Sequence, residues 1–198
     1  MDVNHKDAVA LEKMMLQEKD MIAWILEDVA MMNILRQVQS LGLPDWCICA
    51  GFVRSKVWDK LHGFAPSRLP DVDVVYFDRN HKEESEEKKI ERWLRQLDPS
   101  IPWSVKNQAR MHIKNGQAPY TSTADGLANF PEVCTAIGVR MHAHDELELI
   151  APYGIDDLVN LLVRPTPFFM SDEKRAIYEE RLATKKWETI WPHLCIMR

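Results

Sequence analysis

The sequence predicts an α/β fold of the α+β type, with a small mixed sheet and flanking helices. Helical and strand-like patterns alternate over the first hundred residues, in the order helix, strand, helix, strand, helix, strand. The strand-like runs are short, apolar and bounded by Gly or Pro, as buried strands are. A length of 198 residues suits one sizeable core, so we expect a single domain over 1–198.

Composition and charge limit the classes of protein to which this chain can belong. Apolar residues make up 46% and charged residues 28%, which is typical of a globular chain. With 25 basic and 30 acidic residues the net charge is −5, which excludes general nucleic-acid packaging. No apolar run approaches the ~20 residues of a membrane span, and we expect neither a secretory signal nor a membrane partner. Four cysteines without CxxC spacing fit a reducing compartment, so a cytoplasmic protein is expected.

Hydrophobic spacing places the elements along the chain. Strands are expected at 46–50 (WCICA), 71–78 (DVDVVYFD) and 103–111 (WSVKNQARM), with a hairpin of 137–143 and 146–150. Helices are expected within 7–41 and at 51–63, 81–97, 123–134, 154–163 and 171–190. The N-terminal helices of 7–41, whose apolar stripe begins at Leu11, Met14 and Met15, and the C-terminal helix 171–190 should both pack on the sheet.

The helix at 81–97 is rich in charge. Its expected inner face consists of Ile90, Trp93, Leu94 and Leu97. The acidic run is expected to be solvated, in i, i+4 pairs of Glu84 with Lys88 and Glu91 with Arg95.

Two aspartates mark the second strand. Asp71 and Asp73 are one residue apart, and side chains alternate across a strand, so both carboxylates should leave from one face while Val72 and Val74 enter the core. Such a pair repels itself unless a cation lies beside it. Mg²⁺ prefers a few hard oxygen ligands and leaves other positions to water and phosphate. A solvated turn is the alternative for a DxD on its own.

A turn suited to phosphate lies twenty residues upstream. The first strand ends at Gly51, and a helix follows whose first-turn amides and Ser55 can contact a phosphate. Arg54 and Lys56 would add positive charge there, although both could also be ordinary surface charges of a helix.

These segments carry a family resemblance. AGFVRSKVWDKLHG followed by LPDVDVVYFD resembles the signature of the polymerase-beta-type nucleotidyltransferase superfamily, and its form with Gly51, Val53 and Arg54 is similar to the head of tRNA nucleotidyltransferases. The larger ordered set, which adds VKNQARMH, APYGIDDL and KKWETIWPHL, resembles a bacterial family of nucleotidyltransferase-like proteins of unassigned substrate over about residues 20–195. The resemblance implies a nucleotidyltransferase-type sheet, with Asp71 and Asp73 holding Mg²⁺ or Mn²⁺ and with Gly51 and Phe52 approaching a triphosphate.

The chain departs from the superfamily pattern at two positions. Phe52 stands where Gly or Ser is usual, and the next strand lacks the expected third carboxylate, because its inward position is Lys106 or Asn107. Asn107 is the preferred neighbour of the site, since its amide oxygen can serve as a neutral ligand. Glu148 is the reserve, and Glu132 and Asp145 are further acids that could reach in.

Other polar residues have ordinary explanations beside the functional ones. Arg110 and His112 could contact substrate from the third strand, and His142 and His144 could share a face of the hairpin. A metal site at Cys47 and Cys49 is disfavoured, because no second ligand pair accompanies them. The last helix carries basic residues near two tryptophans and could receive RNA or a nucleotide, with a solvated face as the alternative; they are Lys174, Arg175, Arg181, Lys185, Lys186, Trp187 and Trp191.

The expected function is Mg²⁺-dependent transfer of a nucleoside monophosphate from a nucleoside triphosphate to an unidentified acceptor. Asp71 and Asp73 would bind metal, Gly51, Phe52, Ser55 and Lys56 would lie at the phosphates, and Arg54 would balance the developing charge. The alternative is a catalytically silent member that binds a nucleotide or a protein, which the missing third acid favours. An RNA end as acceptor ranks lower because of the acidic net charge.

Overall fold

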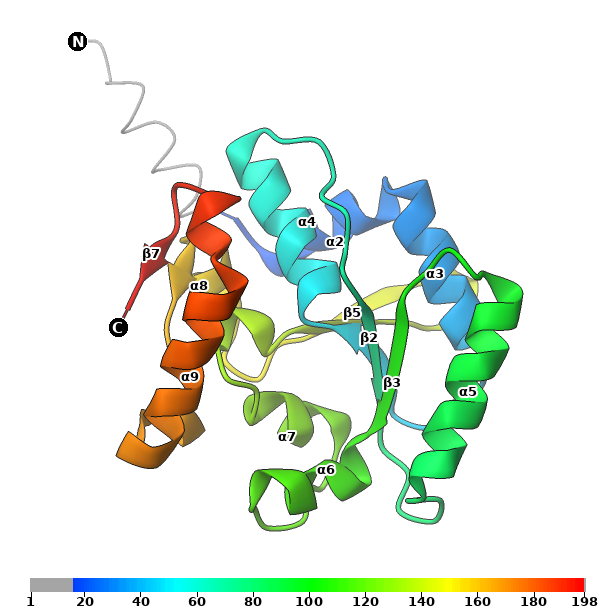
Figure 1. The fold of residues 1–198 in the computed structure, drawn as a ribbon. Helices are drawn as coiled ribbons and strands as arrows, with labels where there is room; N and C mark the ends of the chain where they lie inside the picture. The colour runs from blue at the N-terminus through cyan, green and yellow to red at the C-terminus, as the bar shows by residue number, and fades with distance from the viewer. Residues whose placement is uncertain (1–15, 198) are drawn as a thin grey trace, which may run out of the picture.

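A five-stranded mixed sheet runs through the centre of the structure, a computed structural model that describes residues 16–197 (Figure 1). The strand order is β3-β2-β1-β4-β5. β2 and β3 are parallel, and the other neighbours are antiparallel. The strands are β1 Cys47–Cys49, β2 Val72–Tyr76, β3 Trp103–Asn107, β4 Gly138–Met141 and β5 Leu147–Ile150.

Helices surround this sheet. They are α2 Glu18–Leu26, α3 Val29–Gln39, α4 Gly51–His62, α5 Glu84–Leu97, α6 Gln108–Asn115, α7 Thr123–Ala128, α8 Asp156–Val159 and α9 Asp172–Lys185. Short 3-10 turns cover Val133–Thr135, Ala143–Asp145, Pro167–Met170 and Trp187–Thr189. A separate parallel pair is formed by β6 Leu162–Val163 and β7 Cys195–Ile196.

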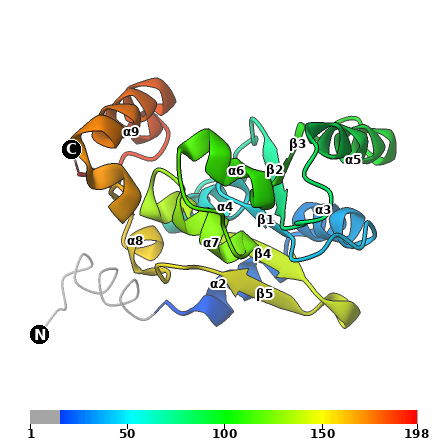
Figure 2. The same cartoon turned by 90° about the horizontal axis from the view of Figure 1, so that it is seen from below.

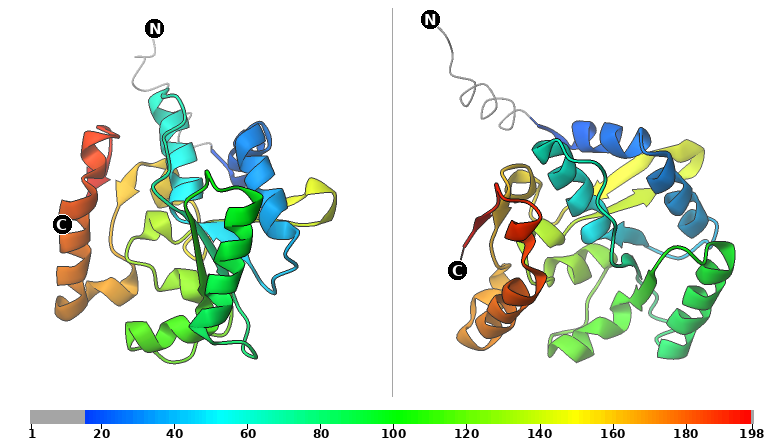
Figure 3. Two further views of the ribbon diagram at one scale, coloured as in Figure 1. Left: turned by 45° about the vertical axis from the view of Figure 1, so that its right-hand side comes forward. Right: turned by 45° about the horizontal axis from the view of Figure 1, so that its top comes forward.

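The two faces of the sheet are covered differently. On one face Ile48, Val74 and Val139 join the main core with the apolar residues of α2, α3 and α4. On the other face Cys47, Cys49 and Val75 pack against Leu127 of α7 in a smaller cluster. Figure 2 shows α6 and α7 on this second side, and in the right-hand view of Figure 3 α9 and α5 lie on opposite sides of the molecule. Asp73 leaves β2 on this second face, and it lines a cavity together with Arg181 and Lys185 of α9.

The elements around the expected site are confirmed. WCICA contains β1, GFVRSKVWDKLHG forms α4, and DVDVVYFD contains β2. Gly63 ends α4 in the left-handed conformation, with φ of 68°, which a residue without Cβ adopts most easily. The hairpin expected around His144 and Asp145 is also present, as the antiparallel pair of β4 and β5. The mixed sheet with flanking helices confirms the expected fold class.

Several expected elements differ from those in the structure. Two helices, α2 and α3, cover 18–39, while Leu11, Met14 and Met15 lie outside the described residues. The third strand stops at Asn107, whose side chain accepts from the N–H of Ala109, so that α6 begins there. Arg110 and His112 are consequently helical. The expected helix 123–134 ends at Ala128, and 154–163 is the short α8 followed by β6.

The C-terminal helix is shorter than expected. α9 ends at Lys185, because Lys186 adopts the left-handed conformation with φ of 46°. The chain then turns back, and the 3-10 turn brings Trp187 and Trp191 into the core against Trp58, with ring centroids 5.6 and 5.1 Å away. This reversal directs the end of α9 toward α4.

The face assignment for α5 is wrong in part. Leu94 is buried as expected, but Trp93 and Leu97 are about half exposed. Glu87 and Glu91, expected in solvent, are buried instead. Glu87 accepts from the N–H of Asn107 at 2.8 Å and forms two 2.7 Å hydrogen bonds with Arg110. These partners on β3 and α6 compensate the carboxylate for its loss of water.

Glu87 predicts how stability depends on pH. Burial alone would raise its pKa, but the hydrogen bonds from Arg110 and Asn107 outweigh this effect and lower the pKa below the ordinary 4.5. Its stabilising contribution is therefore complete above pH 4.5 and is lost as the pH falls through the lowered value. We expect Arg110→Met to decrease the free energy of unfolding at pH 7 by about 3 kcal/mol. Its acid unfolding midpoint should also move to higher pH in denaturation followed by circular dichroism.

Lys89 of α5, the helix that carries Glu87, provides a matched control. Lys89 forms a 2.6 Å pair with Glu86 in which both side chains are exposed. Lys89→Met should change the free energy of unfolding by less than about 0.5 kcal/mol. Equal effects of the two substitutions would contradict the role assigned to Glu87.

Candidate active site

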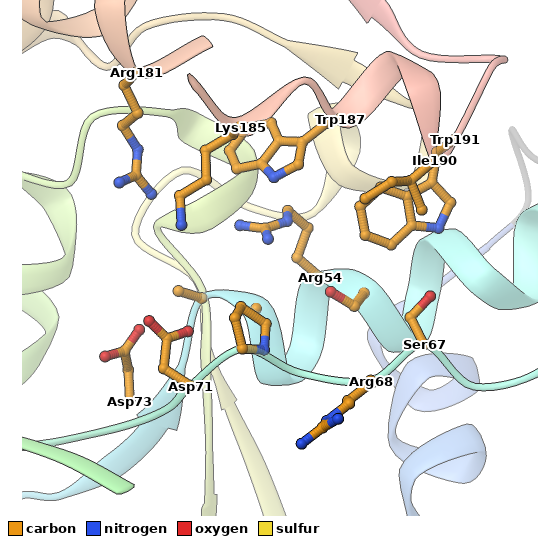
Figure 4. A pocket seen from close by; sticks show the side chains of 14 residues that line it. Arg54, Ser67, Arg68, Asp71, Asp73, Arg181, Lys185, Trp187, Ile190 and Trp191 are labelled. Carbon is orange, nitrogen blue, oxygen red and sulfur yellow. The ribbon is translucent and has the colours of Figure 1, made fainter. Parts of the chain in front are cut away.

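A cavity of about 380 Å³ lies where β2 begins, between the N-terminus of α4 and the C-terminal segment. Figure 4 shows side chains from these elements converging on it. Its lining contains two carboxylates and four cationic side chains. The lining residues are Ala50, Gly51, Arg54, Ser55, Ser67, Arg68, Pro70, Asp71, Asp73, Arg181, Lys185, Trp187, Ile190 and Trp191.

The two aspartates point into this cavity side by side (Figure 4). Strand alternation produces the arrangement, because Val72 and Val74 are buried in the main core while Asp71 and Asp73 leave from the other face. Burial, and next the negative charge of Asp71, raise the pKa of Asp73, and a hydrogen bond from Ser104 offsets this only partly. A cation beside the pair would relieve both effects.

The donor set fits a hard divalent cation that retains much of its own shell. Asp71 and Asp73 supply carboxylate oxygens at a cavity large enough for phosphate and water. Within residues 16–197 no group of three or more His, Cys, Asp or Glu side chains is arranged to hold a metal ion. Any metal here would therefore take its remaining ligands from water and substrate.

Arg54 forms the centre of the opposite wall. Its guanidinium lies 4.2 Å from the ring centroid of Trp187 and 5.2 Å from that of Trp58. The residue is only 7% exposed, and its Nε has no hydrogen-bond partner within residues 16–197. Burial lowers its pKa. A buried cation with an unused donor beside a cavity is poised to bind an anion.

α9 supplies two further cations. Arg181 and Lys185 are four residues apart and extend from one side of the helix toward the aspartates (Figure 4). Arg181 is held by the buried Glu132, with Nε and Oε1 2.5 Å apart. The wall facing Asp71 and Asp73 is thus strongly positive.

The first turn of α4 borders the same cavity. Ala50, the residue before the helix, has a positive φ of 54° and provides no side-chain cap for the first N–H groups. Uncapped donors at a helix N-terminus favour an anion. The strained residue at this turn is thus Ala50, since a Cβ on Gly51 would meet the side chains of Arg54 and Leu69 at ordinary distances of 3.6 and 4.0 Å.

Asp59 ties two walls of the cavity together. Its buried carboxylate accepts from Trp191 Nε1 at 2.8 Å and from the backbone N–H and hydroxyl of Ser67 at 2.7 and 2.8 Å. Trp191 belongs to the C-terminal segment, and Ser67 to the loop that leads to Asp71. The Asp59 side chain therefore holds the C-terminal segment and the loop before Asp71 at a fixed distance from each other.

Two expected phosphate-site residues lie elsewhere. The Phe52 side chain is buried in the main core. Lys56 points toward α3, where its Nζ lies 2.7 Å from a carboxylate oxygen of Asp28. Both side chains border a different cavity, and only the backbone of Phe52 remains near the turn. Gly51, Arg54 and Ser55 do line the cavity with the aspartates.

The structure does not bring Asn107 to the aspartates. Asn107 is fully buried, and its amide is used by the N–H of Asp78 and the carbonyls of Asp78 and His81. Register explains this, because Asp73 pairs with Ser104 and alternation then puts Lys106, not Asn107, on the same face.

The reserve acids are also engaged elsewhere. Glu148 accepts from Arg140 at 3.2 Å and contacts His142 at 2.7 Å, on the hairpin. Asp145 pairs with Arg36 at 2.7 Å. Glu132 lies behind Arg181. None of the three lines the cavity with Asp71 and Asp73.

The sequence predicts a basic segment at the C-terminus that could receive RNA or a nucleotide, with a solvated face as the alternative, but it does not place that segment at the aspartates. Four residues of this segment are Arg181, Lys185, Trp187 and Trp191. In the structure all four line the cavity, and both tryptophans are buried. The usable signal was the combination of basic residues at helical spacing with tryptophans directly after the helix.

The sheet and the paired carboxylates define a nucleotidyltransferase-type fold. The chain belongs to a family described as Nucleotidyltransferase, whose model matches residues 36–196. It is 34% identical to a protein whose NMR structure reveals a CCA-adding enzyme head domain, with a TM-score of 0.83 and coverage of 92% of this chain and 96% of that one.

Larger enzymes share the fold. A tRNA nucleotidyltransferase complexed with a primer tRNA and an incoming ATP analogue is 18% identical, with a TM-score of 0.51 over 83% of this chain and 45% of that one. A CCA-adding enzyme in complex with ATP is 14% identical, with a TM-score of 0.51 over 100% of this chain and 44% of that one. This chain therefore spans less than half the length of these enzymes. The curated proteins contain no match to it.

Among the described residues, no helix has the length and apolar character needed to cross a membrane.

Proposed function

We propose that this protein transfers a nucleoside monophosphate from a nucleoside triphosphate to an acceptor, with Mg²⁺ or Mn²⁺ held by Asp71 and Asp73. The observation that carries the proposal is one cavity with two adjacent carboxylates on one wall and Arg54, Arg181 and Lys185 on the other. A triphosphate with its cation matches both walls.

The chain's own residues would place the triphosphate. Arg54 would offer its guanidinium to the phosphates, and Lys185 would add an ammonium from α9. The first turn of α4, with Gly51 and Ser55, would receive a phosphate at its uncapped N–H groups. The stacked Trp187 keeps Arg54 in place and excludes water from one side of it.

The reaction is a displacement at the α-phosphorus. The acceptor oxygen forms a bond to phosphorus, the bond from phosphorus to the β-phosphate oxygen breaks, and pyrophosphate leaves with that electron pair. The proton of the acceptor passes to solvent. A bound divalent cation would stabilise the charge that develops on the phosphoryl oxygens. Arg54 and Lys185 would act on the same charge from the opposite wall.

A catalytically silent, nucleotide-binding member of the fold is the second candidate. The position opposite Asp73 on β3 is Ser104, and Lys106 is the next residue on that face, so neither supplies a third carboxylate. Such a member would bind the triphosphate and never release pyrophosphate.

Incubation with labelled triphosphate separates the two candidates. With Mg²⁺ or Mn²⁺ and a cell extract as the source of acceptors, the enzyme should move the α-phosphate label onto a product and release pyrophosphate. Asp71→Asn should decrease the rate by about a thousandfold or more, because the loss of a metal ligand removes stabilisation specific to the transition state. Triphosphate binding without any transfer under these conditions would support the silent module instead.

The acceptor remains to be assigned by class. The 34%-identical structure is a CCA-adding enzyme head domain, so an RNA end is one acceptor to test. We rank it lower because the net charge of −5 disfavours a long polyanion. Label on RNA in the incubation above would reverse this order. We also propose a cytoplasmic location, which cell fractionation tests.

A further inference from the structure

A second cavity, of about 290 Å³, adjoins the first across the sheet edge. It shares Ala50, Asp73 and Arg181 with the first cavity, so Asp73 lies on the boundary between the two. The remaining walls come from β2, β3, α6, the segment after α7 and the 3-10 turn Pro167–Met170. A group bound here would lie beside the carboxylates, on the side away from Arg54.

On β3, beside this boundary, Lys106 supplies a positive charge on the strand where a third carboxylate was expected. In the parallel register, Ser104 pairs with Asp73 and Lys106 with Val75, so Lys106 lies on the same sheet face about 7 Å further along the strand. Lys106 lines the second cavity. A base therefore occupies the strand that was expected to supply a third acid.

The ion pair with Glu87 does not fully neutralise the positive charge of Lys106. Its Nζ lies 3.3 Å from Glu87, whose carboxylate already has two 2.7 Å hydrogen bonds from Arg110 and one from a backbone N–H. Lys114, on α6, lines the same cavity and forms no ion pair within residues 16–197. Lys106 and Lys114 thus give this cavity an excess of positive charge that a bound anion would neutralise.

The rest of the wall suits a small polar ligand with one apolar side. Phe130, Phe169 and Met111 provide the apolar part, and Gln108 and Asn129 provide amides. A volume of about 290 Å³ accommodates one ligand of the size of a sugar phosphate.

We propose that the second cavity binds the acceptor, and that the acceptor is a small phosphorylated molecule whose phosphate is held by Lys106 and Lys114. Its hydroxyl would then lie toward Asp73, where the two cavities meet. This inference rests on the proposed nucleotidyl transfer and names the substrate class of the same site.

Calorimetric titration with ribose 5-phosphate tests the inference, with ribose as the uncharged counterpart. Titrations are run both with and without Mg²⁺ and a non-hydrolysable ATP analogue. Ribose 5-phosphate should bind the wild-type protein at least about tenfold more tightly than ribose. Lys106→Met should remove about tenfold of that affinity, whereas Lys106→Arg, which keeps the charge, should stay within about threefold of wild type.

The control lies in the first cavity. Lys185→Met makes the same chemical change there, and it should weaken binding of the ATP analogue while leaving ribose 5-phosphate unaffected. Equal binding of ribose and ribose 5-phosphate, no binding of either, or an unchanged affinity in Lys106→Met would overturn the inference. A short RNA with a free 3′ hydroxyl that binds more tightly than ribose 5-phosphate and depends on Lys106 would overturn it in favour of RNA.

A different experimental result would contradict the proposed nucleotidyl transfer. If the ATP analogue does not bind the wild-type protein, nucleotidyl transfer is contradicted. The titration without the analogue still reports whether Lys106 holds a phosphate.

Discussion

Replacement of Asp71 by asparagine is expected to abolish the magnesium-dependent part of triphosphate binding while leaving the fold intact. Asn keeps the shape of the side chain but removes the charge that attracts a cation, and Asp73 alone then remains on this wall. The affinity for a non-hydrolysable ATP analogue, measured by calorimetry with Mg²⁺, should fall at least about a hundredfold. With EDTA in place of Mg²⁺, the variant should bind at least as tightly as the wild-type protein, because the Asp71 charge no longer repels the triphosphate.

Stability should respond in the opposite direction to affinity. The pKa of Asp73 is raised by burial and by the charge of Asp71, so removal of the Asp71 charge relieves a repulsion in the folded state. The melting temperature of Asp71→Asn in EDTA should therefore be no lower than that of the wild type.

Glu148→Gln is the matched control for Asp71→Asn. Glu148 is a carboxylate on the hairpin, paired with Arg140 and His142 and outside the cavity. Its substitution should change the affinity for the ATP analogue by less than about twofold. An Asp71→Asn protein that binds the analogue as tightly as Glu148→Gln would show that Asp71 is not a metal ligand.

Arg54→Met is expected to separate binding from stability. Arg54 is buried on Trp187, its Nε lacks a partner among the described residues, and burial lowers its pKa, so the folded protein carries an incompletely satisfied charge. Met retains an apolar stem for the tryptophan and removes that charge. Triphosphate affinity should fall by about 10- to 100-fold, while the free energy of unfolding in denaturant should stay equal or rise.

A lysine of the same helix provides the comparison for Arg54. Lys60 lies on α4, exposed, 3.7 Å from Glu27. Lys60→Met should affect neither triphosphate affinity nor stability appreciably. If Arg54→Met unfolded the protein or left triphosphate affinity unchanged, Arg54 would be a structural residue rather than an anion ligand.

Local patterns predicted the core of the fold and half of the cavity. β1, α4 and β2 follow one another within thirty residues, and Gly51, Asp71 and Asp73 could be placed from strand alternation and from the turn between strand and helix. Strand alternation and this turn are set by residues close together in the sequence, so they can be predicted from the sequence alone.

The opposite wall could not be placed in this way. Arg181 and Lys185 come more than a hundred residues after Asp73, and they reach the cavity only because Lys186 reverses the chain and both tryptophans pack on Trp58. No local pattern encodes that docking. The basic character of the helix was visible, but not the surface that it would face.

Burial of charge was the second difficulty. Glu87 and Glu91 belong to an acidic run whose sequence predicts a solvated face. In the structure they are buried and accept hydrogen bonds from Arg110 of α6 and from backbone N–H groups of β3. Asn107 shows the same limit, because its amide caps α6 and closes the loop after β2. The residue type indicated a polar interaction in each case, but only the strand register of the folded protein shows which groups are the hydrogen-bond partners.

Electron paramagnetic resonance of Mn²⁺ tests the assignment of Asp71 and Asp73 most directly. In the presence of a non-hydrolysable ATP analogue, the wild-type protein should remove Mn²⁺ from the free-ion signal in stoichiometric amount. A protein with both Asp71→Asn and Asp73→Asn should leave that signal at the level of the analogue alone. Equal uptake of Mn²⁺ by the two proteins would place the metal elsewhere and contradict the proposed chemistry.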